Sequence, residues 1–293
     1  MESHTGRRIA AAIAVAGVAI TCELSAARAG TAGVVQRGLF ALLGAKPAIV
    51  AYAKTTASSD TAVTLTIRQF MNGGQKPIRH YDVDMQMLMH VIVVRDDFAD
   101  FMHVHPAFDS TAGTFEQSFA KSAGHRYYVF ADSSPRGIGQ QVFRFTVDRN
   151  GATTAQQPSV PSFAATPSPS SVRTGPYTVA LSSTRLPSGR GQAVTVNVSE
   201  AGRPARDLEP YLGAAAHAVF IGTANLSYVH VHPSASGTMP MASGASMDMS
   251  AGEAAGPHML MELPPLPAGT YKLWVQFQGA GRLYAAPFTI LSR

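Results

Sequence analysis

Cysteine is almost absent from this sequence, and its scarcity removes several kinds of site. The 293 residues contain one cysteine, Cys22, close to the N-terminus. A lone cysteine cannot close an internal disulfide, and it cannot supply an all-cysteine zinc site. Any metal that this chain binds must therefore be held mainly by histidine, methionine, carboxylate or backbone groups.

Charged residues are also scarce, at 14% of the chain against about 25% in an average soluble protein. Hydrophobic residues make up 46% of the sequence, so the chain has ample apolar material to bury and is not a charge-rich disordered protein. The formal net charge is +5, but lysine and arginine are scattered rather than clustered. The sequence therefore predicts no nucleic-acid partner.

The first 29 residues have the pattern of a signal peptide. Arg7 and Arg8 precede an apolar stretch of 13 residues, Ile9 to Thr21, which is too short for a membrane span of about 20 residues. A small-x-small cleavage site follows at 27–29. Cleavage near Ala29 would remove Cys22, and with it the thiolate that a blue-copper centre needs. We expect a periplasmic or secreted protein without a transmembrane span in the mature chain. In the alternative, Cys22 is a lipid-attachment site, which the preceding residues fit poorly.

Two segments repeat one pattern, which indicates a tandem duplication. His90 precedes a His-Val-His-Pro motif at 103–106, and His217 precedes the same motif at 230–233. In both copies the first histidine of the motif comes thirteen positions after the single histidine, and the flanking apolar segments match as well. Each copy therefore spans about 100 residues, the size of an ordinary domain.

Both copies consist of short apolar runs separated by Gly, Pro, Asn, Asp and Ser, a pattern typical of strands. The pattern predicts an all-β fold of two tandem immunoglobulin-like antiparallel β-sandwich domains joined by a Pro/Ser-rich linker. In the N-terminal segment, Val34 to Leu43 has the periodicity of a short helix, although a docked or frayed segment fits it too. We place the signal peptide at 1–29, the N-terminal segment at 30–47, the repeats at 48–148 and 172–293, and the linker at 149–171. In the first repeat the runs fall near 48–54, 62–69, 77–83, 87–94, 101–105, 114–120, 126–131 and 141–147.

The recurring histidines predict a metal site in each repeat. Two histidines that are two residues apart on a strand point to one face. If Val94 pairs with Phe101 across the turn, the single histidine lies opposite the second histidine of the motif, and the three imidazoles share a patch. A slip of one residue would send the single histidine to the other face. The predicted ligands are His90, His103 and His105 in one repeat and His217, His230 and His232 in the other.

Imidazoles bind metal only when neutral, so we expect binding to weaken as pH falls through about 6.5. In the alternative interpretation, each motif is a polar strand edge and the single histidine is a buried core residue.

Methionine is unusually clustered. Nine of the twelve methionines lie in Met-x-Met arrays, and four of these fall in the Ser/Gly/Ala-rich loop 234–257. Thioether sulfur is a soft ligand that selects Cu(I), whereas methionine on a strand commonly fills gaps in the core. The predicted auxiliary ligands, with one further histidine, are Met85, Met87, Met239, Met241, Met247, Met249, His258, Met259 and Met261.

The repeated motifs, the approach Tyr211 to His217 and the lead-in Ala268 to Tyr271 resemble exported bacterial proteins with tandem Ig-like HxHP repeats. Those proteins are similar to periplasmic copper- and heavy-metal-handling proteins. The resemblance covers most of residues 48–291 and implies metal handling. The first repeat departs from the pattern, since Met85 stands where a further histidine is expected. If that position is a ligand, the change favours Cu(I).

Taken together, the patterns predict a periplasmic or secreted copper-binding protein for tolerance or delivery. It would take Cu(I) or Cu(II), with zinc as the alternative ion, and exchange it with a metal-donor or acceptor protein. Two other classes stay open: a non-catalytic structural or adhesive module, and a three-histidine zinc hydratase or hydrolase. We favour a protein that is not an enzyme, because no carboxylate recurs with the histidines in both repeats and no GxSxG or P-loop motif is present.

Overall fold

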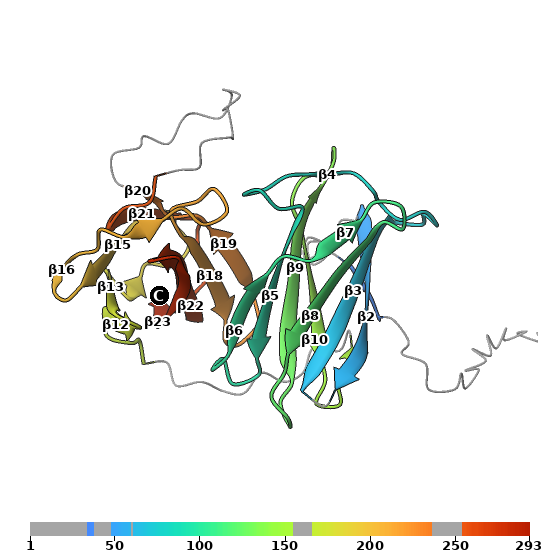
Figure 1. Cartoon of the computed structure of the whole chain (residues 1–293), viewed down its shortest axis with the longest axis horizontal. Helices are drawn as coiled ribbons and strands as arrows, with labels where there is room; N and C mark the ends of the chain where they lie inside the picture. The colour runs from blue at the N-terminus through green and yellow to red at the C-terminus, as the bar shows by residue number, and fades with distance from the viewer. Residues whose placement is uncertain (1–33, 38–47, 60, 155–165, 236–253) are drawn as a thin grey trace, which may run out of the picture. The chain divides into compact units, whose positions relative to one another are not determined.

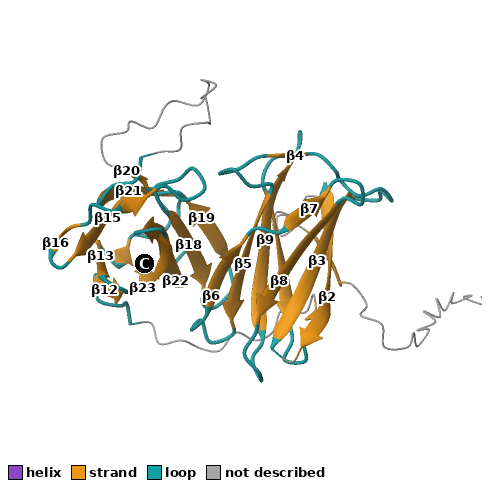
Figure 2. Ribbon diagram, viewed as in Figure 1, coloured by secondary structure: helices purple, strands orange, loops and turns teal. Residues whose placement is uncertain are grey.

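The structure is a computed structural model, and it describes residues 34–37, 48–59, 61–154, 166–235 and 254–293. The described residues form strands and connecting loops, and no helix occurs among them. Figure 2 shows this all-β architecture. No described segment is a helix with the length and hydropathy that crossing a membrane requires.

The first domain is a β-sandwich of two sheets (Figure 1). One sheet has the strand order β1-β2-β3-β8-β7, and the other has the order β11-β10-β9-β5-β6, with β4 paired to β9. The strands are β1 Val34–Arg37, β2 Ile49–Ser59, β3 Ala62–Met71, β4 Tyr81–Asp82, β5 Met89–Arg95, β6 Phe101–Val104, β7 Ala107–Asp109, β8 Thr114–Ala120, β9 Tyr127–Pro135, β10 Gln141–Val147 and β11 Thr153–Thr154.

The second domain repeats this arrangement. Its sheets have the orders β12-β13-β15-β21-β20, with β16 paired to β15, and β14-β23-β22-β18-β19, with β17 paired to β22. The strands are β12 Ser171–Thr174, β13 Tyr177–Leu181, β14 Arg185–Leu186, β15 Gln192–Glu200, β16 Arg203–Pro204, β17 Leu208–Glu209, β18 His217–Gly222, β19 Tyr228–Val231, β20 Ser234–Ala235, β21 His258–Leu263, β22 Gly269–Gly279 and β23 Arg282–Ser292.

The predicted fold class, two tandem β-sandwiches, is confirmed, and two local expectations are corrected. Residues 34–37 form the strand β1, paired antiparallel with β2, so the helix considered for this segment does not form there. Pairing with β2 makes this segment a strand, and the periodicity of the segment alone does not reveal that pairing. The run 77–83 is mostly loop: Pro77 forms only an isolated bridge to Phe70, and Tyr81–Asp82 pairs with β9 as the short strand β4.

One sheet of each sandwich is buried on both faces. In β5, Val91 and Val93 contribute to the core of the first sandwich, whereas Ile92 and Val94 belong to a separate apolar cluster. That cluster also contains Val219 from β18 and Trp274 from β22, so it joins the two domains. Because side chains alternate along a strand, the second face of these sheets is an interface between the repeats.

The two repeats contribute equivalent aromatic pairs to this interface. Phe101 of the first repeat stacks on Trp274 of the second, with ring centroids 4.8 Å apart. Tyr228, which corresponds to Phe101, stacks on Phe130, which corresponds to Trp274, at 5.2 Å. Each domain therefore uses the same surface to contact the other, as the subunits of a twofold-symmetric dimer do.

Candidate metal centre

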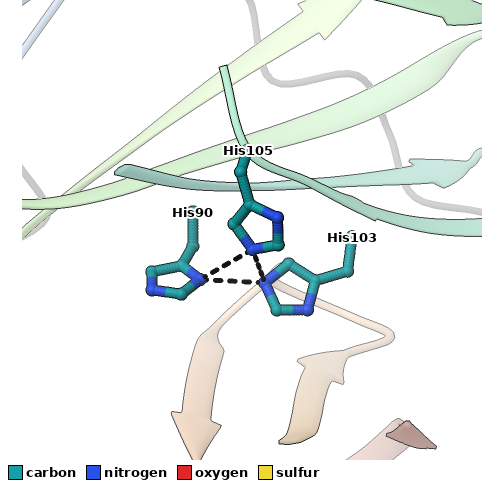
Figure 3. A group of neighbouring side chains, drawn as sticks. All are labelled: His90, His103 and His105. Atoms are coloured by element: carbon teal, nitrogen blue, oxygen red, sulfur yellow. Dashed lines mark hydrogen bonds between the residues drawn. The ribbon is translucent and has the colours of Figure 1, made fainter. Parts of the chain in front are cut away.

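Two hairpins place the recurring histidines. β5 pairs with β6 in the register Val94↔Phe101, as predicted, and β18 pairs with β19 with Ala218 opposite Val231. His103 and His230 therefore lie on the interface face of their strands, because their neighbours Met102, Val104, Val229 and Val231 pack toward the sandwich cores. Figure 3 shows His90, His103 and His105 with their rings turned toward one another.

In the first repeat, three ring nitrogens form a small triangle. His90 Nδ1 lies 3.0 Å from His103 Nε2, and His105 Nε2 lies 3.2 Å from each of these two atoms. An ion bonded at about 2.0–2.1 Å to three imidazoles in tetrahedral geometry would hold the nitrogens about 3.3 Å apart. The triangle therefore has nearly the dimensions of a three-histidine metal site.

The outer nitrogens of two of these rings are occupied by hydrogen bonds. His90 Nε2 donates to the Asp84 carbonyl oxygen at 3.1 Å, and His103 Nδ1 donates to Gln276 Oε1 at 2.8 Å. A neutral imidazole carries one N–H, so these bonds leave His90 Nδ1 and His103 Nε2 as unprotonated lone pairs. The two lone pairs face each other with a single N–H available between them from His105, an arrangement that a cation would stabilise.

The second repeat reproduces the first two positions. His217 Nε2 donates to the Tyr211 carbonyl oxygen at 3.1 Å, and His217 Nδ1 lies 3.2 Å from His230 Nε2. His103, His217 and His230 can each direct one ring nitrogen into a common group, with the three atoms within 4.8 Å of one another. The two histidine groups are thus neighbours across the domain interface.

His232 takes part less directly. Its ring packs 4.8 Å from that of His217 and 4.6 Å from that of His230, measured between centroids. Its Nε2 atom is buried and has no hydrogen-bond partner in the described structure. A buried polar atom without a partner is costly, and a bound cation would satisfy it.

Burial keeps these imidazoles neutral. Loss of hydration, reinforced by neighbouring imidazoles, lowers the pKa of His103 to about 2 and that of His105 to about 3. The same causes lower the pKa of His217 to about 3 and that of His232 to about 4. Desolvation also lowers the pKa of His90 and of His230. Neutral imidazole is the form that coordinates metals, so the loss of binding expected near pH 6.5 should instead occur at lower pH.

Two polar residues at the centre were not identified from the sequence. Asp132 of β9 and Gln276 of β22 lie directly across from His90 and His217 in their sheets. Each contacts a histidine of the other repeat: Gln276 contacts His103, and Asp132 Oδ2 lies 3.9 Å from His230 Nδ1. A polar residue on the interface side of a strand with apolar neighbours was the available signal.

The predicted auxiliary ligands lie in different parts of the structure, and not all of them are near the histidines. Met85 and Met87 are half-buried in or beside the turn that precedes His90, where Met85 and Gln86 have positive φ. Met259 and Met261 are buried in the core of the second sandwich, so the structure does not bring them to the histidines. His258 is exposed and bonds to Asn197 at 2.7 Å. Met239, Met241, Met247 and Met249 lie outside the described residues.

The fold and the site together define an all-β protein of two Ig-like sandwiches with a buried histidine cluster between them. The chain belongs to the family described as Domain of unknown function (DUF8832), which it matches twice, over residues 48–151 and 170–292. The two matches agree with the two sandwiches. A comparison with curated proteins found no match.

Proposed function

We propose that this protein binds a first-row transition metal at the histidine cluster, with copper as its ion. One observation carries the proposal. In His90 and His103 the ring N–H donates to an outer partner, so the other nitrogen of each ring is unprotonated, and these two nitrogens face each other at 3.0 Å. A bound cation removes the repulsion between them. Protonation is the other remedy, and the lowered pKa values of these histidines oppose it.

The donor set narrows the choice of ion. Imidazole nitrogen suits copper, zinc, nickel and iron, and at a site of this kind Cu(II) binds most tightly of the divalent ions from manganese to zinc. Carboxylate-preferring ions such as Mg²⁺ and Ca²⁺ are poorly matched, because three imidazoles contain no oxygen. The four methionines of the loop 234–257 add a soft donor set that favours Cu(I).

We further propose export as the setting. The N-terminal pattern with Arg7, Arg8 and the cleavage site near Ala29 supports a periplasmic or secreted protein, in which copper tolerance or delivery is a fitting role. Delivery requires a metal-donor or acceptor protein as partner. N-terminal sequencing of the exported protein tests the cleavage position.

Metal titration tests the proposal directly. Purified mature protein is titrated with Cu(II), Zn(II) and Cu(I), the last under reducing conditions, and the titration is repeated on a His103→Ala, His105→Ala double variant. We expect binding of Cu(II) by the wild-type protein, and in the variant loss of tight binding at the position of the first repeat, because two of its three converging ligands are gone. Replacing the four loop methionines by leucine should reduce the Cu(I) stoichiometry and leave Cu(II) binding unchanged.

His80→Ala is the matched control, since His80 is exposed and lies outside the cluster. Its metal affinity should equal that of the wild-type protein. If the wild-type protein binds none of the three ions above background, the metal-binding proposal fails and the structural or adhesive role is favoured.

A further inference from the structure

We propose that the six histidines form one binuclear metal centre shared by the two domains, rather than the two separate sites that the sequence suggests. This inference rests on the proposed metal-binding function and goes further, because it specifies how many ions bind and how close together they lie. One ion would be held by His90, His103 and His105. The second would be held by His217 and His230, with the neighbouring His232 ring as the remaining donor, and it would face the first ion across the domain interface.

The distances between histidine rings of different repeats show that the two groups are adjacent. His103 lies 5.1 Å from His217 and 5.2 Å from His230, measured between ring centroids. These values are close to the separations within one repeat, such as 5.2 Å between His90 and His103 and 5.5 Å between His217 and His230. No layer of other side chains fits between the two groups at such distances, so ions bound to them would be only a few ångströms apart.

The two repeats also exchange supporting residues. Gln276 of the second repeat accepts a hydrogen bond from His103 of the first, and Asp132 of the first lies beside His230 of the second. Such outer partners hold a ligand ring in one orientation and one tautomer. Each ion position is therefore completed by the other domain, and neither repeat by itself contains all the groups that define its site.

The electrostatic environment is compatible with two ions. The interface contains a carboxylate, Asp132, whose side chain is 2% exposed. It accepts hydrogen bonds from Tyr228 and Gln140, and within the described part of the chain no arginine or lysine is bonded to it. A buried carboxylate without a cationic partner is unfavourable, and two adjacent cations would supply the missing positive charge.

Electron paramagnetic resonance of the full-length mature protein loaded with Cu(II) tests the inference. Cu(II) is a suitable probe whatever the natural ion, because it binds nitrogen sites at least as tightly as the other divalent first-row ions. We expect two Cu(II) ions per chain and a spin-coupled spectrum with a half-field transition. Isolated Cu(II) ions would give only an uncoupled mononuclear spectrum.

His105→Ala and His232→Ala provide the matched variants, since each removes one ligand from a different position. Either variant should retain one tightly bound Cu(II) and convert the spectrum to the mononuclear form, whereas His80→Ala should leave both stoichiometry and coupling unchanged. Two ions without coupling, or a single ion in the wild-type protein, would overturn the binuclear centre while leaving metal binding intact. Absence of any Cu(II) binding would instead refute the proposed function.

Discussion

The residues that determine how well a histidine cluster holds an ion are often not the ligands. In this protein Asp132 and Gln276 occupy equivalent places, but one is an acid and the other an amide. Desolvation raises the pKa of Asp132 to about 7, although hydrogen bonds from Gln140 and Tyr228 favour the carboxylate. The two proposed ion positions would therefore differ electrostatically, and the one beside Asp132 should bind a cation more tightly.

Asp132→Asn tests this difference. The amide keeps one oxygen for Gln140 and Tyr228, so we expect the fold to persist, but it removes the negative charge beside His230. Metal affinity at one of the two positions should fall by about 10- to 100-fold, the usual effect of losing such an outer partner.

The measurement is a competition titration with a chelator of known affinity. Asp148→Asn is the control, because Asp148 is paired with Arg126 and lies outside the cluster. Equal affinities for the wild-type protein and Asp132→Asn would show that the carboxylate does not support His230.

At the scale of single elements, the strands β5 and β18 explain why the centre is buried. Every residue of β18 is buried, and in β5 only the terminal Arg95 is not. One face of each strand packs in its own sandwich and the other packs against the partner domain, so a ligand on the second face is shielded from water on both sides. The aromatic stacks of Phe101 on Trp274 and of Tyr228 on Phe130 join the two domains at this same interface.

Trp274→Ala should therefore destabilise the protein strongly. Trp274 is 3% exposed and stacks on Phe101 across the interface. Truncating a buried tryptophan to alanine costs about 3–5 kcal/mol of the free energy of unfolding, through lost burial and the cavity that remains.

Urea denaturation followed by circular dichroism measures this loss without relying on the tryptophan itself. Leu283→Ala, at a side chain that is 46% exposed, should change the free energy of unfolding by less than about 0.5 kcal/mol. A loss below about 1 kcal/mol in Trp274→Ala would mean that the stack contributes little to the domain interface.

At the scale of the whole molecule, the interface couples stability to pH. The folded state lowers the pKa of the cluster histidines, to about 2 for His103 and about 3 for His217, whereas in the unfolded chain they titrate near 6.5. Below that pH the unfolded chain binds protons that the folded protein excludes, so the contribution of these histidines to stability is lost as pH falls. Asp132 acts in the opposite direction, because its raised pKa favours folding at low pH, but it is one group against several.

The free energy of unfolding of the metal-free protein should therefore decrease progressively from pH 7 to pH 4. Chemical denaturation at constant ionic strength over this range measures the trend. A variant with His105 and His232 both changed to Gln should show a shallower decline, since its unfolded chain has two fewer histidines that bind protons over this pH range. A wild-type stability that is flat between pH 7 and pH 4 would contradict the lowered pKa values.

The sequence by itself determined the fold class and the local geometry of each hairpin. Strand periodicity places successive side chains on opposite faces, and the polar turn sets the register, so residues such as Val94 and Phe101 could be paired without a structure. The repeat also predicted that His90 and His217 occupy equivalent positions in the two copies, and they do, each opposite a polar residue of the neighbouring strand. Residues 34–37 were not predicted as a strand, because they become one by pairing with β2, and a segment's own periodicity does not reveal its pairing partner.

Only the tertiary structure decided that the two histidine groups lie together. The packing of one domain on the other depends on complementary surfaces, Phe101 on Trp274 and Tyr228 on Phe130, and no local pattern encodes which surfaces will meet. The tertiary structure also separated methionines that are alike in sequence: Met259 and Met261 are buried in the core of the second sandwich, whereas Met85 is half-buried in the turn that precedes His90. The near absence of cysteine leaves imidazole and thioether as the soft donors of this chain, and the folded interface determines which imidazoles lie together.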